Sequence, residues 1–400
     1  MKKGWQTKTI GDVCEFQRGL TYAKGDEVDV SDNVVLRATN IDLATNLLIF
    51  DELKYISDKV VVPGSKKVKQ GSLMICMASG SKSHLGKVAF IEDDYGYAFG
   101  GFMGMLTPLN GLLPKYLFHL MTSEDYKGFI RALSDGANIN NLTFDKLKVF
   151  PVPVPPLAEQ QRIVGLLDEA FEGIATAKGN TEKNLQNARA LFESHLQSVF
   201  TQRGPGWVET TIGEACVLKS GTTVSPMLEK PIGDVPYLKV ADMTFVGNAD
   251  KITTSSRFLC DEDVRESSII PKGSTIFPKR GGAILTNKKR ITSVSICADL
   301  NIMAVIPSSQ IDSELLYLYF INVDMRKLGT GSTIPQINNY DVAPLLISFP
   351  AAISEQRKIV AELGELRKET QRLARLYERK LAALEALKKS LLHQAFSGEL

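Results

Sequence analysis

The chain has 400 residues, of which 44% are hydrophobic and 23% are charged, and its formal net charge is +2 at pH 7. These values are ordinary for a folded protein of two or three domains, each long enough to bury its own core. The sequence holds no apolar run of about 18 residues, which excludes a membrane-spanning helix. No apolar stretch follows the lysines at positions 2 and 3, so we expect no secretory signal and a cytoplasmic location.

The sequence has five cysteines, and no two of them stand at a spacing that suits a metal ion. Cys14 and Cys216 lie in apolar surroundings. We therefore expect both to be small core residues rather than reactive thiols.

Residues 1–152 are predicted to form a mixed α/β domain. Short apolar runs between glycine and aspartate turns predict strands at 72–78, 87–91 and 102–106, and helical patterns predict helices at 114–121 and 129–133. The domain ends in a segment with four prolines between positions 151 and 156. Proline excludes a helix interior or a central strand, so this segment is predicted to be a stiff, extended boundary.

A long helix is predicted from Leu157 to about Gln202, within a helical spacer that covers 153–205 and ends at a Gly/Pro stop signal. Small and apolar residues recur along it every three or four positions and predict a packing seam: Ile163, Leu167, Ala170, Ile174, Ala177, Thr181, Asn184, Ala188, Leu191 and His195. Asn184 either fixes the register of this seam or lies just beside it.

Residues 206–349 are predicted to repeat the first domain. The segment Gly4–Gly19 returns at Gly206–Gly221, with an offset of 202 and seven identical residues among sixteen. A second correspondence, with an offset of 196, pairs Glu159-Gln160 with Glu355-Gln356. Strands are expected at 273–277 and 302–306, and a helix at 315–321. A period this long indicates a whole domain and its connector duplicated in tandem, not a solenoid.

The second helical spacer covers 350–400, with a helix from 353 to about 396. Its seam steps by alternating four and three residues, which is typical of a coiled coil: Ile359, Leu363, Leu366, Thr370, Leu373, Tyr377, Lys380, Leu384, Leu387 and Leu391. We expect the two long helices to pair antiparallel. Helices of 40 to 45 residues span about 60–70 Å, which exceeds one turn of B-DNA, about 34–36 Å.

The predicted fold class is therefore α+β, with two similar mixed α/β domains separated by two long antiparallel coiled-coil helices and related by a pseudo-two-fold axis. Such a chain presents two similar surfaces to one two-fold object, and duplex DNA is such an object. Two windows favour this partner, because residues 59–91 and 267–298 each contain six basic residues and no acidic one. Phosphate binding depends on local positive potential rather than on net charge.

Motifs for catalysis are missing from the sequence. The segment 99–104 is glycine-rich but lacks the strand–loop–helix frame of a dinucleotide site, and the region of Gly80 to Lys87 fails the spacing of a phosphate-binding loop. The four histidines are scattered and form no triad or zinc pattern. We therefore expect a chain that binds and does not catalyse.

Three sets of polar loops occupy equivalent places in the two domains and are the predicted DNA contacts, because lysine, arginine and asparagine bind phosphates and base edges. The first set is Lys82, Ser83, His84 and Lys87 with Lys279, Arg280, Asn287, Lys288, Lys289 and Arg290. The second set is Asn138 and Asn140 with Thr333 and Gln336. The third set is Arg37 and Asn40 with Lys239 and Asp242. Turn chemistry is an equal alternative for the second set, and a salt bridge or cap for the third.

The whole chain resembles the specificity subunit of type I restriction-modification systems. The resemblance rests on the Gly-Trp…Thr-Ile-Gly openings at Gly4 and Gly206, on the segment 153–164 (PVPPLAEQQRIV) with its echo at 350–360, and on the ending 391–400 (LLHQAFSGEL). It implies two target-recognition domains that each read half of a split DNA site, and helices that act as spacer and dock methyltransferase subunits. It also implies that S-adenosylmethionine, ATP and Mg²⁺ are bound by the methyltransferase and the restriction/translocase subunits, and none by this chain.

Two other functions remain as alternatives. A stand-alone enzyme acting on DNA would need a catalytic motif, and the sequence offers none. A helical adaptor that joins proteins without nucleic acid would not explain the two acid-free basic windows.

Overall fold

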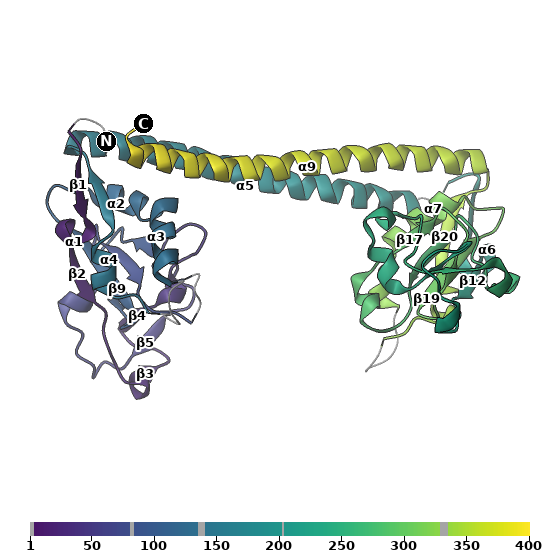
Figure 1. Ribbon diagram of the computed structural model, residues 1–400, viewed down its shortest axis with the longest axis horizontal. Helices are drawn as coiled ribbons and strands as arrows, with labels where there is room; N and C mark the ends of the chain where they lie inside the picture. The colour runs from purple at the N-terminus through teal and green to yellow at the C-terminus, as the bar shows by residue number, and fades with distance from the viewer. Residues whose placement is uncertain (1–3, 81–83, 135–140, 202–203, 329–334) are drawn as a thin grey trace. The chain divides into compact units, whose positions relative to one another are not determined.

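The computed structural model describes residues 4–80, 84–134, 141–201, 204–328 and 335–400 (Figure 1). The chain divides into two compact units, one comprising residues 1–182 and 379–400 and the other residues 183–378. Each unit therefore contains one α/β domain together with a piece of both long helices. No helix in the described ranges combines the length and apolar character needed to cross a membrane.

The domain of the first unit is built on short sheets. Strand β1 (Gln6–Thr9) pairs antiparallel with β10 (Pro151–Val154). A four-stranded antiparallel sheet has the order β2 (Cys14–Arg18), β9 (Met103–Pro108), β6 (Leu73–Cys76) and β7 (Val88–Phe90). A second sheet has the order β3 (Glu27–Val28), β5 (Lys54–Ile56), β4 (Asn33–Leu36) and β8 (Ala98–Phe99). The proline-rich segment is thus extended, as predicted, and also forms a strand, which proline permits because β10 has a single neighbour.

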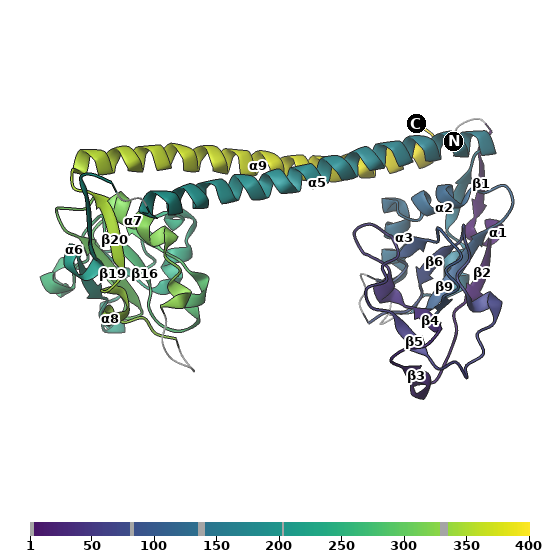
Figure 2. The same cartoon turned by 180° about the vertical axis from the view of Figure 1, so that it is seen from behind.

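The helices of this domain are α1 (Ile10–Val13), α2 (Pro114–Leu120), α3 (Glu124–Ser134) and α4 (Phe144–Lys148). Single 3₁₀ turns lie at η1 (Lys24–Asp26), η2 (Ala38–Asn40) and η3 (Gly64–Lys66). In Figures 1 and 2, α2 and α3 lie next to the long helices, whereas β3 and β5 lie at the opposite end of the domain.

The domain of the second unit repeats this plan. Strand β11 (Trp207–Thr211) pairs with β20 (Leu346–Pro350). Its larger sheet has the order β12 (Cys216–Ser220), β19 (Ile302–Pro307), β16 (Thr275–Pro278), β17 (Arg290–Thr292) and β14 (Lys251–Ile252). The smaller sheet has the order β15 (Phe258–Leu259), β13 (Val235–Leu238) and β18 (Cys297–Ala298).

The helices of the second domain are α6 (Ile212–Ala215), α7 (Ser313–Asn322) and α8 (Asn339–Val342). Its 3₁₀ turns are η4 (Pro226–Leu228), η5 (Val240–Thr244), η6 (Val246–Asn248), η7 (Asp261–Asp263), η8 (Glu266–Ser268), η9 (Gly281–Thr286) and η10 (Met325–Lys327). The turn η10 follows α7 where the first domain has the longer helix α3.

Strand register reveals how the duplicated domains correspond. Leu73 pairs with Leu106 in the first domain and Thr275 pairs with Val305 in the second, so the offset is 275 − 73 = 202 on one strand and 305 − 106 = 199 on the other. The offset of 202 residues therefore holds up to β6 and β16 and does not hold at β9 and β19. The second domain is three residues shorter than the first between these strands, so equivalent residues have to be assigned from the strand pairing.

The long helices are α5 (Leu157–Thr201) and α9 (Ile353–Ser397), and they pair antiparallel as predicted. In the first unit, Lys178 Nζ lies 3.0 Å from Glu385 Oε1, and Arg162 Nη2 donates to the Leu400 carbonyl at 2.8 Å. In the second unit, Arg189 Nη2 lies 2.8 Å from Glu378 Oε1. The predicted fold class, two similar mixed α/β domains with two long antiparallel helices, is thus confirmed.

The predicted seam is wrong in the later part of each helix. Along α5, Asn184, Leu191 and His195 are exposed, and the residues that face inward are Leu185, Ala188, Phe192 and Leu196. Along α9, Lys380 and Leu387 are exposed, and the inward positions pass to Leu381, Leu384, Lys388 and Leu392. The reason is that a straight helix has 3.6 residues per turn and drifts by about 20° per heptad from a 3.5-residue repeat.

Each domain is fixed to the helices by a shared core. In the first unit, Ile163 and Leu167 of α5 and Ala395 and Phe396 of α9 are buried in the core of the domain. The rings of Tyr116 and Phe396 pack edge to face with centroids 5.2 Å apart. Because both helices share a core with the domain, the domain is expected to move with the helix ends that it contacts.

The repeated Glu-Gln motif has a structural role at these junctions. Gln160 is fully buried, and its amide donates to the carbonyls of Gly111 and Pro155, both at 2.9 Å. Gln356 is equally buried and donates to the carbonyls of Gln310 and Pro350, both at 2.8 Å. Each glutamine therefore ties the first turn of a long helix to the loop that precedes α2 or α7.

Candidate nucleic-acid interface

The described segments that flank the three predicted loop sets meet in one place in the first domain. Met77 donates its backbone N–H to the Phe102 carbonyl at 2.9 Å, and Leu142 donates to the Met77 carbonyl at 2.6 Å. Gly100 donates to the Leu36 carbonyl at 2.9 Å, next to Arg37. Backbone hydrogen bonds thus connect loops that lie far apart in the sequence.

The second domain uses equivalent bonds. Lys279 donates its N–H to the Asn301 carbonyl at 2.8 Å and accepts from Ile337 at 2.9 Å, and Asp299 donates to the Leu238 carbonyl at 2.8 Å. We call these two regions the loop clusters. They comprise residues 37–40, 77–80, 84–87, 99–103 and 141–142 in the first domain, and 239–242, 279–290, 299–302 and 335–338 in the second.

Close backbone approach explains the repeated glycine that ends each opening segment. A Cβ atom at Gly19 would lie 1.9 Å from the Gly100 carbonyl oxygen, and one at Gly221 would lie 2.1 Å from the Asp299 carbonyl oxygen. Any side chain at either position would push the loop away. These glycines therefore hold the loop cluster in shape and need no contact with a ligand.

Several predicted contact residues are buried and bonded within the protein. Asn40 is 1% exposed, accepts the Arg37 N–H and donates to the carbonyls of Ile49 and Glu52. Lys87 donates to the Ile41 carbonyl. Lys279 donates to Ser220 Oγ at 2.7 Å. These side chains stabilise the loops, because leaving a buried polar group without its partner would be costly. Their contact with DNA stays a prediction.

Other predicted contacts in the second domain are also bonded within the protein. Lys289 is 3% exposed, burial lowers its pKa to about 8, and it donates to Asn287 Oδ1 at 2.9 Å. Arg290 donates to the Asn248 carbonyl at 2.7 Å. Lys239 Nζ pairs with Glu229 Oε1 at 2.7 Å, which is the salt bridge that sequence analysis kept as an alternative. Of the predicted basic group of this domain, Arg280 is exposed and Lys288 is half-buried.

Five predicted contacts lie outside the described residues: Lys82, Ser83, Asn138, Asn140 and Thr333. The described neighbours of these positions include Asn141, which is exposed and forms a β-bridge through Ala78. His84 is half-buried. The role of all these side chains in DNA contact stays a prediction.

Two exposed aromatic residues in or beside the loop clusters were not among the predicted contacts. Phe102 is 74% exposed in the first cluster. Beside the second cluster, Gln336 donates to Asn338 Oδ1 at 2.6 Å, Asn338 donates to the Tyr340 hydroxyl at 2.8 Å, and Tyr340 is 69% exposed. The sequence carries no signal that separates such an aromatic residue from a core residue, because exposure depends on tertiary packing.

Free thiols do not contribute to the site. Cys14 and Cys216 are buried, as predicted, and burial raises the pKa of both to about 12, which keeps them protonated at neutral pH. Among the residues that the structure describes, no group of three or more histidine, cysteine or acidic side chains is placed to hold a metal ion.

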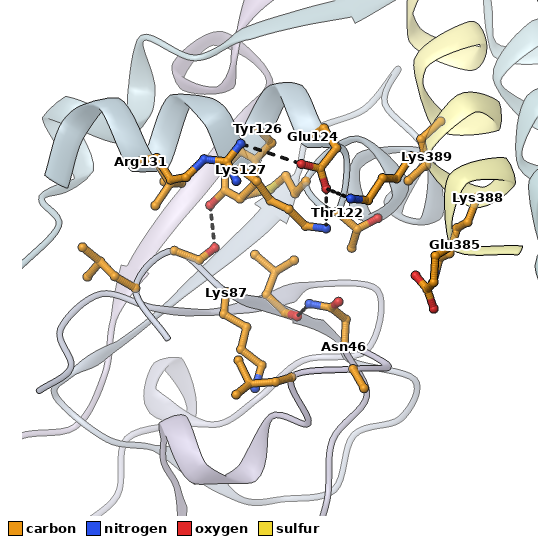
Figure 3. Close-up of a pocket in the computed structure, with 18 residues that line it drawn as sticks. Asn46, Lys87, Thr122, Glu124, Tyr126, Lys127, Arg131, Glu385, Lys388 and Lys389 are labelled. Atoms are coloured by element: carbon orange, nitrogen blue, oxygen red, sulfur yellow. Dashed lines mark hydrogen bonds and ion pairs between the residues drawn. The ribbon is translucent and has the colours of Figure 1, made fainter. Parts of the chain in front are cut away.

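A separate pocket of about 410 Å³ lies in the first unit, between α3, α9 and the loop at Asn46 (Figure 3). Glu124 lies among its cations, 3.2 Å from Lys127, 3.7 Å from Arg131 and 3.8 Å from Lys389. Burial opposes ionisation of Glu124, but the neighbouring cations outweigh it and hold its pKa below the usual value. The ion pair of Glu124 with Lys389 joins α3 to α9.

The architecture defines a class of protein: a tandem pair of similar α/β domains, each with a polar loop cluster, carried on two paired helices. The chain belongs to the type I restriction modification DNA specificity domain family, which it matches over residues 2–186 and 205–379. These two matched ranges contain both domains and large parts of both helices.

Comparison with known proteins agrees with this assignment. The chain is 26% identical to the type I restriction enzyme StySPI specificity subunit of Salmonella potsdam and 26% identical to the EcoKI specificity subunit of Escherichia coli K12, in each case over 100% of this chain and 90% of the relative. Its fold is similar to that of the HsdS subunit from Thermoanaerobacter tengcongensis, with a TM-score of 0.65, 19% identity, and coverage of 100% of this chain and 98% of that one. A chain from a structure of a type I R-M system gives a TM-score of 0.80 at 19% identity, covering 100% and 99% of the two chains.

Proposed function

We infer that this chain is the DNA sequence-specificity subunit of a type I restriction-modification complex, and that each domain binds one half of a bipartite DNA target. The observation that carries this inference is the duplication of the loop cluster within a chain of the specificity family. Two similar but non-identical clusters suit a target made of two different half-sites. The exposed polar members Arg280 and Asn141 and the half-buried Gln336 are residue types that bind base edges and phosphates.

The helices are proposed to set the gap between the half-sites and to dock methyltransferase subunits. One pair of residues supports the docking role. Leu191 on α5 and Leu387 on α9 are equivalent under the 196-residue offset, and they are 52% and 47% exposed. Exposed leucines at matching places on both helices are suited to two copies of one partner.

Leu191→Asp together with Leu387→Asp tests this docking surface. We expect the double variant to fold, because both side chains are exposed, and to lose co-purification with the methyltransferase subunit. Leu376→Asp is the matched control, since this leucine is also exposed (42%) but has Asn180 at its equivalent position. Full co-purification of the double variant would contradict the assignment.

The chain is proposed to be non-catalytic, with S-adenosylmethionine, ATP and Mg²⁺ bound by its methyltransferase and restriction partners. Adenine methylation mapping in a host that carries the chain and its methyltransferase tests the whole proposal. We expect modification at one bipartite sequence, lost when the chain is deleted. If the chain were a stand-alone enzyme, the purified chain alone would methylate or cleave DNA. If it were a helical adaptor, the methylation pattern would not change when the chain is deleted.

A further inference from the structure

The first loop cluster contains a pocket of about 570 Å³. Three flat side chains line it, namely Tyr22, Arg37 and Phe102. Phe102 projects from the Gly100–Gly101 turn and is 74% exposed. The ring is therefore accessible to a ligand that enters the pocket.

Arg37 is available for a ligand because its acidic neighbour is already engaged. Glu27 lines the same pocket and forms an ion pair with Lys54. Among the described residues, the Arg37 guanidinium makes no hydrogen bond or ion pair, and its Nε is buried without a partner. An unpaired guanidinium beside a cavity favours a ligand that offers a flat face and acceptor atoms.

Hydrogen-bonding groups lie beside these flat side chains. The hydroxyl groups of Thr21 and Thr39 line the pocket, and neither has a protein partner among the residues that the structure describes. Lys24 is exposed at its edge. A nucleobase needs both features, since its faces stack on aromatic rings or guanidinium planes and its edges form hydrogen bonds.

The equivalent region of the second domain lacks all three of these flat side chains. Strand pairing places Val224 at the position of Tyr22, Lys239 at that of Arg37, and Asn301 at that of Phe102. Lys239 is held by Glu229, and Asn301 donates to Asp299 Oδ1 at 2.5 Å. This combination of three flat side chains is therefore present in the first domain and is not repeated in the second.

We propose that this pocket receives one nucleobase that leaves the base stack of the half-site bound by the first domain. Phe102 and Tyr22 cover its faces, Arg37 and the threonine hydroxyls bind its edge, and Lys24 contacts the adjacent phosphate. The proposal rests on the proposed function, since it requires DNA at the loop cluster. A contact between Phe102 and a thymine methyl group on a stacked base would need no pocket of this size.

The test uses the complex of the full chain with its methyltransferase and the bipartite target found by methylation mapping. 2-Aminopurine is placed at successive purine positions, and permanganate reactivity reports unstacked thymines. We expect one reactive position in the first domain's half-site, distinct from the methylated adenine, whose signal falls at least about fivefold in Phe102→Ala. Because Phe102 is exposed, this variant should fold, and Val61→Ala, at an apolar side chain that is 84% exposed and lies outside both loop clusters, is the control that leaves both half-sites unchanged.

The outcomes separate the two levels of inference. Binding and methylation without any Phe102-dependent unstacking would overturn the base pocket and leave the proposed function intact. Phe102→Ala could also lower affinity without any unstacking, and replacing thymine with uracil could lower it equally. This result would overturn the base pocket and indicate a contact between Phe102 and a thymine methyl group. If the complex did not bind the mapped target, both the proposed function and the base pocket would be wrong.

Discussion

The side-chain oxygen of Gln160 accepts the backbone N–H of Leu113 at 2.8 Å, which couples the first turn of α5 to the residue that precedes α2. The same relationship recurs in the second unit, where Gln356 accepts the N–H of Asp312 at 2.7 Å. A buried amide with three backbone partners specifies one orientation of domain and helix within the unit. The glutamine of the repeated Glu-Gln motif therefore has the same structural role in both units.

Replacing Gln160 or Gln356 by alanine is expected to lower stability by about 2–3 kcal/mol, because buried backbone groups lose their partners. Denaturant midpoints of the two variants measure the effect. Glu355→Ala is the control, since Glu355 forms a surface ion pair with Lys358, worth at most about 1 kcal/mol. Equal shifts in all three variants would contradict the role of the glutamines.

Adjacent leucines on α5 test the packing of the helix seam. Leu167 is 1% exposed and Leu166 is 41% exposed. Leu167→Ala should cost about 2–5 kcal/mol through loss of buried surface and an unfilled cavity. Leu166→Ala should cost less than about 0.5 kcal/mol. Thermal unfolding of both variants gives the comparison, and similar losses would mean that the buried face is wrongly assigned.

His119 is expected to make the first unit sensitive to acid. It is 4% exposed, its Nε2 lies 2.8 Å from Asp168 Oδ1, and its Nδ1 has no partner among the described residues. Burial lowers the pKa of His119 below its ordinary value of 6.5 and outweighs the opposing effect of Asp168. The folded state therefore binds fewer protons than the unfolded state, and stability is lost as pH falls below 6.5 toward the lowered pKa, by up to about 1.4 kcal/mol per pH unit.

Melting temperatures between pH 7.5 and 5 measure this loss. His119→Gln keeps a donor toward Asp168 and cannot titrate, so its melting temperature should fall less steeply. His393, which is exposed, provides the control: His393→Gln should retain the pH profile of the original chain. A profile that is unchanged in His119→Gln would assign the acid sensitivity to other groups.

Arg280 is expected to act on one half-site. Its side chain is exposed and its backbone forms a β-bridge with Gln336 in the second loop cluster. Arg280→Ala should weaken binding by about 1–3 kcal/mol if it reads a base, and only for targets that keep the second domain's half-site. Binding to targets mutated in each half-site in turn measures this, and equal loss at both would argue against independent reading.

Removing seven residues from the middle of both α5 and α9 tests the proposed spacer. Each deletion shortens its helix by about 10 Å, which corresponds to about three base pairs at 3.4 Å each. The mapped target should keep both half-sites and shorten its gap by that amount. Deletion in α5 alone serves as the control, because it breaks the pairing of Lys178 with Glu385 and should abolish assembly instead. An unchanged gap in the double deletion would refute the spacer role.

The long helices, the duplicated domains and some of the strands could be predicted from the sequence because they depend on local periodicity and on repetition. The helices at 157–201 and 353–397 and the strands around Met74 and Ala304 follow from such patterns. The seam in each later half could not be fixed from a heptad count, since a small drift per turn accumulates along 45 residues.

The candidate site divides in the same way. The equivalence of the loops could be read from the residues alone, because duplication leaves matching glycines at Gly19 and Gly221 and polar segments after them. The exposure of their side chains follows from the fold: Lys279 is buried against Ser220, whereas Phe102 is exposed. Burial depends on backbone contacts between segments distant in sequence, and no local pattern of residue types encodes it.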